Sequence, residues 1–168
     1  MQNRRIHIVG RKNSGKTTLI VELLKEYHVL GIRVASIKHT SHDHELDVPG
    51  KDSFVLRKAG SEMVGIITEN LTAIYQATEH GPYKYDTLER AMHDVDLILV
   101  EGDLSTGMPK IEVYRPDIHA NQLPLIVEHP TISFVVTNAP LELSVPTVPR
   151  SDVKSVAKKI LDLAGYLV

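Results

Sequence analysis

The amino-acid sequence predicts an α/β fold built on a mostly parallel sheet, with one inserted antiparallel hairpin. Segments typical of strands alternate with segments typical of helices along the chain, which is the pattern of a parallel sheet covered by helices. Two β-rich runs separated by Glu69-Asn70 interrupt that alternation between residues 62 and 77, and their spacing predicts the hairpin. A chain of 168 residues with this pattern is expected to form one domain, 1–168.

The first strand, loop and helix contain the clearest motif. A short apolar strand over 5–9 is followed by Gly10-Arg11-Lys12-Asn13-Ser14-Gly15-Lys16-Thr17 and then by apolar residues at helical spacing. The loop fits G-x-x-x-x-G-K-[ST], the P-loop, in which backbone N–H groups and the positive end of a helix dipole surround a polyphosphate. The fold class is therefore predicted more closely as the three-layer P-loop NTPase fold.

The residues of the P-loop have expected roles. Lys16 is expected to reach the β- and γ-phosphates and to act in catalysis, and Thr17 is expected to ligate Mg²⁺. The residues expected to bind nucleotide in this part of the chain are Gly10, Arg11, Lys12, Asn13, Ser14, Gly15, Lys16, Thr17 and Thr18.

The remaining elements follow in chain order. We expect a second strand over 32–37 and a short helix that begins at Asp52 or Ser53 and stops at Gly60. The hairpin strands are expected over 63–68 and 71–76, and a helix over 85–93. Further strands are expected over 94–102, 111–114 and 132–137, and a last helix is expected to open at 151–153.

A carboxylate at the end of a neighbouring strand is needed to complete a Mg²⁺ site, because the triphosphate alone leaves the metal underliganded. Glu101 ends the most apolar strand, and Gly102 lets the backbone come close, so Glu101 is the predicted ligand. Asp96 is a weaker choice because it lies at the amino end of that strand, and Asp103 could assist. The alternative is that Glu101 only caps a surface strand end.

The most polar segment, 38–53, follows the second strand and allows three interpretations. In the leading one the segment touches the phosphates, Mg²⁺ or the activated water, through His39, His42, Asp47, Lys51 and Asp52. Of these, His39 is expected to bind nucleotide, Asp47 to ligate Mg²⁺ and Asp52 to act in catalysis. A second is a metal site formed by the histidines at 39, 42 and 44, since imidazole suits zinc, nickel and copper. The third is a solvated loop with neither role.

Base recognition has a weaker signal. The chain has no N-K-x-D run of the kind that reads guanine in many GTPases. Asn138, at the end of a late strand, is the predicted base contact, with the alternative that it only starts a turn.

Composition bears on which partners the protein binds and in which compartment it is found. A formal net charge of −2 and a pI near 6.5 argue against a dedicated nucleic-acid binder. With no cysteine, no apolar run of bilayer length and no room for a signal peptide before the first strand, we expect a cytoplasmic protein without a membrane partner.

Several stretches together indicate a family. They are the P-loop, Lys38-His39…His42…Asp47…Gly50-Lys51-Asp52-Ser53, Ala59-Gly60, Leu97-Ile98-Leu99-Val100-Glu101-Gly102 and Pro109-Lys110-Ile111-Glu112-Val113. Over about residues 4–140 the chain resembles the molybdopterin-guanine dinucleotide biosynthesis protein B family, called MobB. It departs from the family where residues 103–108 intervene before Pro109, since Glu-Gly is usually followed there by a bulky residue and a lysine.

The resemblance implies a homodimeric protein that binds GTP with Mg²⁺ and has weak GTPase activity. Its implied partner is the molybdenum cofactor guanylyltransferase, the nucleotidyltransferase that joins GMP to molybdopterin. We expect the hairpin near 62–77 to pair with its copy in a second subunit, because an isolated hairpin is marginal in water. The alternatives are a P-loop kinase of a small molecule and a metal-chaperone GTPase that uses His39, His42 and His44.

Overall fold

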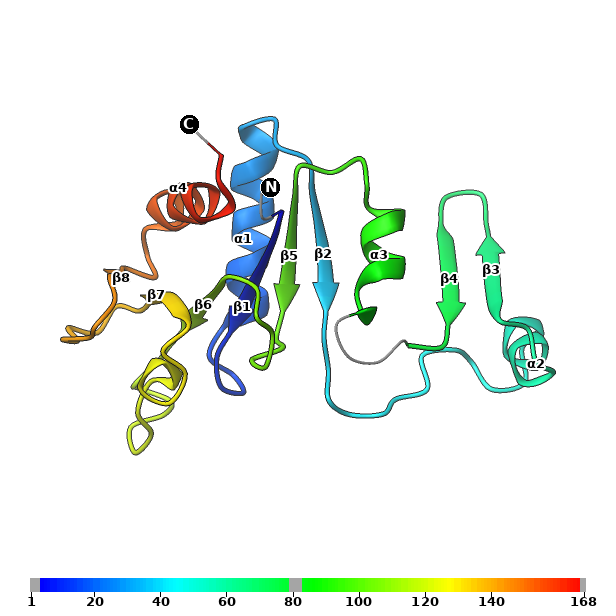
Figure 1. Ribbon diagram of the computed structural model, residues 1–168, viewed down its shortest axis with the longest axis horizontal. Coiled ribbons are helices and arrows are strands. Elements are labelled where there is room, and N and C mark those ends of the chain that lie inside the picture. The colour runs from blue at the N-terminus through cyan, green and yellow to red at the C-terminus, as the bar shows by residue number, and fades with distance from the viewer. Residues whose placement is uncertain (1–3, 79–82, 167–168) are drawn as a thin grey trace. The chain divides into compact units, whose positions relative to one another are not determined.

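The computed structural model describes residues 4–78 and 83–166 (Figure 1). Its described residues fall into two compact units, one formed by the chain up to residue 40 together with the chain from residue 94, and one formed by 41–93. Each unit is described by itself below. The expectation of one domain over 1–168 stays a prediction.

The first unit is organised around a six-stranded sheet in which every neighbouring pair of strands is parallel. The strands are β1 (Arg5–Val9), β2 (Val34–Lys38), β5 (Leu97–Glu101), β6 (Lys110–Val113), β7 (Ile132–Val136) and β8 (Thr147–Val148), in the order β2-β5-β1-β6-β7-β8. The predicted parallel sheet is thus confirmed. Because β1 lies between β5 and β6, the loop that follows β1 opens at the centre of the sheet edge formed by the strands' carboxyl ends.

Two helices cover one face of this sheet, α1 (Lys16–Val29) and α4 (Val153–Ala164). Both contribute fully buried side chains to the main core, as do alternate residues of the central strands. The two helices are also joined directly, since the buried Tyr27 hydroxyl donates to the Ala157 carbonyl oxygen over 3.0 Å. α4 begins as expected, with the Asp152 carboxylate accepting from the N–H of Ser155.

A second apolar cluster uses the intervening strand positions. Val9 belongs to it, whereas its neighbour Ile8 belongs to the main core, as the alternation of side chains across a strand requires. This cluster is completed by the 3₁₀ turn η2 (Leu125–Val127) and by partly buried residues of the segment between β7 and β8. On this side, therefore, loops and a short turn do much of the covering.

The second unit contains the hairpin and two short helices. Its elements are α2 (Asp52–Lys58), β3 (Met63–Ile67), β4 (Thr72–Gln76) and α3 (Asp86–Ala91). β3 and β4 pair antiparallel with Met63 opposite Gln76 and form a sheet of their own, which confirms the predicted hairpin (Figure 1).

The structure differs from the sequence prediction at small elements. β8 and η2 were not predicted, because two or three residues are too few for a periodic pattern. α3 covers 86–91, where a helix over 85–93 is expected, and β2 begins at Val34 rather than at residue 32. Among the helices of the described ranges, none is long and apolar enough to cross a membrane.

Candidate functional site

The backbone of the loop between β1 and α1 has conformations that favour glycine and leaves no room for a Cβ at Gly10. Gly10 has φ +149°, and a Cβ there would lie 2.5 Å from the Val113 carbonyl oxygen and 2.7 Å from Ser14 Oγ. Val113 ends β6, the strand beside β1, so the loop passes directly against the neighbouring strand end. Asn13 and Gly15 also have positive φ, and Gly15 caps α1.

Lys16 stands at the first position of α1 and lies across the loop. Its Nζ donates to the carbonyl oxygens of Gly10 and Arg11, both over 2.8 Å. Burial lowers the pKa of Lys16, the carboxylate of Glu101 acts in the opposite direction, and the charge of Lys38 lowers it further. A cation is thus held at the mouth of the loop, where an anionic ligand would compensate its partial burial.

Two of the three predicted metal ligands, Thr17 and Glu101, lie together. Thr17 Oγ1 donates to Glu101 Oε2 over 2.7 Å. The contact follows from the fold, because Glu101 ends β5, the strand paired with β1, with Ile8 opposite Glu101 in the register. A hydroxyl and a carboxylate oxygen side by side are the ligand types that Mg²⁺ takes.

One buried polar atom in the loop bears on whether a phosphate fits it. Ser14 is 1% exposed, and its Oγ has no hydrogen-bond partner among the described residues. Buried hydroxyls are normally hydrogen-bonded, so this atom fits a loop whose ligand supplies oxygen acceptors. Together with the cradle around Gly10 and the Thr17–Glu101 pair, the residues present fit a magnesium-bound phosphate group.

The segment after β5 is fixed from two sides. The fully buried His7 lies with Nδ1 3.1 Å from the Gly102 carbonyl oxygen, and burial lowers the pKa of His7 to about 4. The ring is therefore neutral at pH 7, and because a carbonyl only accepts, Nδ1 carries the hydrogen. Directly after β2, the His39 N–H donates to the Glu101 carbonyl oxygen over 2.9 Å, so the backbone of His39 lies beside Glu101. Contact of the His39 side chain with nucleotide stays a prediction.

A cavity of about 500 Å³ opens beside the end of the loop. Its lining comes from the end of the loop and the start of α1, from the segments after β6 and β7, and from Arg150. The other lining residues are Ser14, Gly15, Thr18, Tyr114, Arg115, Pro116, Asp117, Thr137, Asn138 and Ala139. Asn138 Oδ1 accepts from the N–H and the hydroxyl of Ser151, over 3.1 and 3.3 Å. Asn138 thus joins two segments at the cavity wall, and its contact with a base stays a prediction.

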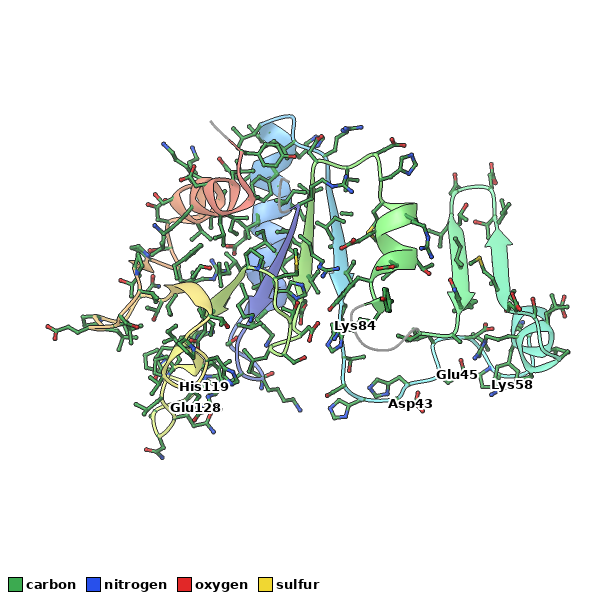
Figure 2. The ribbon with its side chains drawn as sticks, in the orientation of Figure 1. Asp43, Glu45, Lys58, Lys84, His119 and Glu128 are labelled. Atoms are coloured by element: carbon green, nitrogen blue, oxygen red, sulfur yellow. The ribbon has the colours of Figure 1, made fainter. Side chains whose placement is uncertain are left out.

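Sequence reasoning missed a segment that supports the P-loop, residues 115–124. The Arg11 guanidinium donates to the Leu123 carbonyl oxygen over 3.1 Å, and His119 Nε2 lies 2.9 Å from the Lys12 carbonyl oxygen. Figure 2 labels His119 within the part of the chain that leads from β6 to β7. Both P-loop residues are therefore tied to one segment more than 100 positions further along the chain.

Glu112 anchors the far end of that segment. Its fully buried carboxylate accepts from the N–H groups of Leu125 and Ile126, over 2.7 and 3.0 Å. Burial raises the pKa of Glu112, and the two backbone N–H groups oppose that rise. A carboxylate between apolar neighbours in the strand Lys110-Ile111-Glu112-Val113 was the one sequence signal for this anchor.

The other predicted site residues lie in the unit 41–93. Asp47 is buried, and its Oδ1 accepts from the Val48 N–H and the Ser53 hydroxyl, while Asp52 opens α2. Figure 2 labels Asp43 and Glu45 in the same segment, where Glu45 forms an ion pair with Arg57. Roles of Asp47 toward Mg²⁺ and of Asp52 in catalysis stay predictions.

Three further groups named in the sequence analysis are the histidines at 39, 42 and 44, Asp96 and Lys110. Within 4–78 and 83–166 no three histidine, aspartate or glutamate side chains are grouped to hold a metal ion, so the metal-chaperone alternative gains no support there. Asp96 lies at the amino end of β5, as expected, and pairs with Arg33 over 3.0 Å. Lys110, in the stretch that carries the family resemblance, is buried and donates to the Thr106 carbonyl oxygen and the Thr131 hydroxyl.

Comparison with known proteins identifies the family of this chain. The family model MobB, "Molybdopterin guanine dinucleotide synthesis protein B", matches residues 5–138. The chain is 32% identical over 152 residues to the molybdopterin-guanine dinucleotide biosynthesis adapter protein of Escherichia coli, covering 89% of this chain and 86% of that protein. It is 38% identical over 138 residues to the protein of that name from Haemophilus influenzae, covering 81% and 75%.

A solved structure shows the same fold. The crystal structure of a molybdopterin-guanine biosynthesis protein B superposes with a TM-score of 0.71 at 26% identity, covering 96% of this chain and 99% of that one. With 96% of this chain covered, the similarity extends over both units. The chain belongs to the MobB family of molybdopterin guanine dinucleotide synthesis proteins.

Proposed function

We propose that this protein binds Mg²⁺·GTP on its P-loop and acts as an adapter in the synthesis of molybdopterin guanine dinucleotide. The observation that carries the proposal is the hydrogen bond between Thr17 and Glu101 beside the cation of Lys16. The proposal is supported because P-loop proteins use groups of these types to hold a metal ion and the phosphates bound to it. The adapter role rests on family membership and on the names of the relatives.

Binding is the proposed main output, and hydrolysis is proposed to be slow. Fast hydrolysis needs a cationic group that stabilises the charge on the transferring phosphoryl group, commonly an arginine. Arg11, the arginine of the loop, donates to the Leu123 carbonyl oxygen and is thereby engaged with the segment 115–124. Residues Thr17 and Glu101 would hold the metal, which would neutralise charge on the phosphates.

The proposed partners are a second copy of the chain and the molybdenum cofactor guanylyltransferase. The hairpin supports the first, because Met63, Ile67, Leu71 and Ile74 are exposed on it, Ile67 to 84%. A hairpin that forms a sheet by itself has two open edges that can pair with another strand. Sedimentation at micromolar concentration tests this proposal, and a purely monomeric species would contradict it.

Calorimetric titration tests the nucleotide proposal. GTP and ATP, each with Mg²⁺, are titrated into the wild-type protein and into Lys16→Ala. Removal of one charge-assisted contact is expected to weaken GTP binding by about ten- to a hundredfold. Lys25→Ala is the matched control, because Lys25 is an exposed lysine on the same helix, and it should bind as the wild type does. Binding of ATP in place of GTP would contradict the proposal and favour a small-molecule kinase.

A further inference from the structure

We infer that Asp117 is the residue by which the site recognises guanine. This inference deepens the proposed function and rests on it. The segment that holds Asp117 follows β6 and lines the cavity beside the P-loop. The sequence gives no N-K-x-D run that would supply a guanine-reading carboxylate in the usual position.

The position of the cavity makes it the place for the nucleoside. Gly15 and Thr18, at the end of the loop and in the first turn of α1, belong to its lining. A ligand whose phosphates lie in the P-loop would therefore continue into this cavity at its α-phosphate end. A volume of about 500 Å³ falls within the range of small-ligand pockets, so a ribose and a purine can be accommodated.

Some polar side chains that line the cavity already form hydrogen bonds within the protein, and others can form hydrogen bonds with a base. Arg150 Nη1 pairs with Glu22 Oε2 over 2.6 Å, which directs that guanidinium to α1. The oxygen of Asn138 accepts from Ser151, so the part of its carboxamide left to face a ligand is the NH₂ donor. Asp117 is the one acidic side chain among the residues that line the cavity.

Asp117 is held in place by its neighbour. Arg115 Nη2 lies 2.5 Å from Asp117 Oδ2, and Arg115 Nε donates to Oδ1 over 3.3 Å. The guanidinium lowers the pKa of the carboxyl, so the group is an anion at neutral pH. A carboxylate has about four lone-pair sites and can accept further hydrogen bonds while it is paired with an arginine.

The chemistry of the purines decides which base suits this wall. Guanine presents N1–H and N2–H₂ donors beside the O6 acceptor, whereas adenine presents an acceptor at N1. An acceptor-only carboxylate binds both guanine donors and repels the adenine N1 lone pair. The Asn138 NH₂ group offers a donor for a guanine acceptor. The pair Asp117 and Asn138 thus complements guanine and opposes adenine.

The test changes the acceptor to an amide without altering its size. GTP, ITP, XTP and ATP are titrated with Mg²⁺ into the wild-type protein and into Asp117→Asn. Asparagine can donate to the C2 carbonyl of xanthine but cannot accept from both guanine donors. We expect GTP binding to weaken by about ten- to a hundredfold, and XTP to become the better ligand. ITP, which lacks the 2-amino group, should bind the wild type more weakly than GTP.

Controls separate this inference from the proposed function. Glu128→Gln neutralises another exposed carboxylate of the same stretch (Figure 2) and should leave all four affinities unchanged. Asp117→Ala should lose the preference for GTP without gaining XTP. Unchanged preference for GTP in Asp117→Asn would overturn the assignment of Asp117 while leaving GTP binding intact. A wild-type protein that binds none of the triphosphates would overturn both the assignment and the proposed function.

Discussion

The hydroxyl of Thr17 donates to the carboxylate of Glu101 over 2.7 Å, although 84 positions separate the two residues in the chain. The contact exists because β1 and β5 are paired in parallel and end at the same edge of the sheet. It joins the first turn of α1 to the end of a buried strand, and it places the two proposed Mg²⁺ ligands in direct contact.

Removing either the hydroxyl of Thr17 or the carboxylate of Glu101 is expected to abolish the gain in GTP affinity that Mg²⁺ provides. In Glu101→Gln the carboxylate charge is lost, so nucleotide affinity with Mg²⁺ should fall toward the affinity measured with excess EDTA. Thr17→Val should behave in the same way, whereas Thr17→Ser keeps the hydroxyl and should retain the response. Titration of GTP with and without Mg²⁺ measures the effect, and Glu142→Gln, at an exposed carboxylate, is the control. Full magnesium dependence in Glu101→Gln would contradict the proposed metal site.

A methyl group at Gly10 is expected to destabilise the protein. The Cβ of Gly10→Ala would lie 2.5 Å from the Val113 carbonyl oxygen, at a φ of +149° that L residues rarely adopt. Strain of this kind costs roughly 1–3 kcal/mol of unfolding free energy, measured by urea denaturation. Gly107→Ala is the control, because a Cβ at Gly107 meets nothing within 4 Å. Equal stability of the two variants would show that the loop does not need glycine at position 10.

Acid is expected to destabilise the protein through His7. Burial lowers the pKa of His7 from 6.5 to about 4, so the folded protein holds this ring neutral where the unfolded chain protonates it. The stabilisation is fully present above pH 6.5 and is lost as the pH falls from 6.5 toward 4. At 1.36 kcal/mol for each pKa unit, the loss amounts to roughly 3 kcal/mol.

Urea unfolding at a series of pH values measures this dependence. In His7→Gln the side chain does not titrate, so the fall in unfolding free energy between pH 6.5 and 4 should be smaller than in the wild type by that amount. The difference between the two curves isolates His7 from the other titrating groups. Parallel curves would mean that His7 is not held neutral in the folded protein.

The sequence was sufficient for those parts of the site that depend on short motifs and apolar strands. The P-loop fits a contiguous pattern, and the position of Glu101 at a strand end was predictable because the strand before it is apolar along its length. The parallel sheet followed from the alternation of strands and helices, and the hairpin from the spacing of its two runs.

Other parts depend on contacts between distant positions, which a pattern does not encode. The support of the P-loop by Leu123 and His119 uses two carbonyl groups and long-range hydrogen bonds, and any residue type can supply a carbonyl. The cavity wall at Asp117 lies in a segment without periodicity, so its proximity to the loop emerged only from the fold. Asp47 and Asp52 belong to the unit 41–93, and their roles toward nucleotide remain predictions.

The contact between His119 and the Lys12 carbonyl oxygen links the P-loop to the turn that follows β6. The ring of His119 additionally contacts the Arg115 carbonyl oxygen through Nδ1, over 3.1 Å, so one imidazole spans from the strand-end turn of Arg115 to the P-loop. The turn at Arg115, which lines the cavity, and the P-loop are therefore joined through the segment 115–124, by His119 to Lys12 and by Arg11 to the Leu123 carbonyl oxygen.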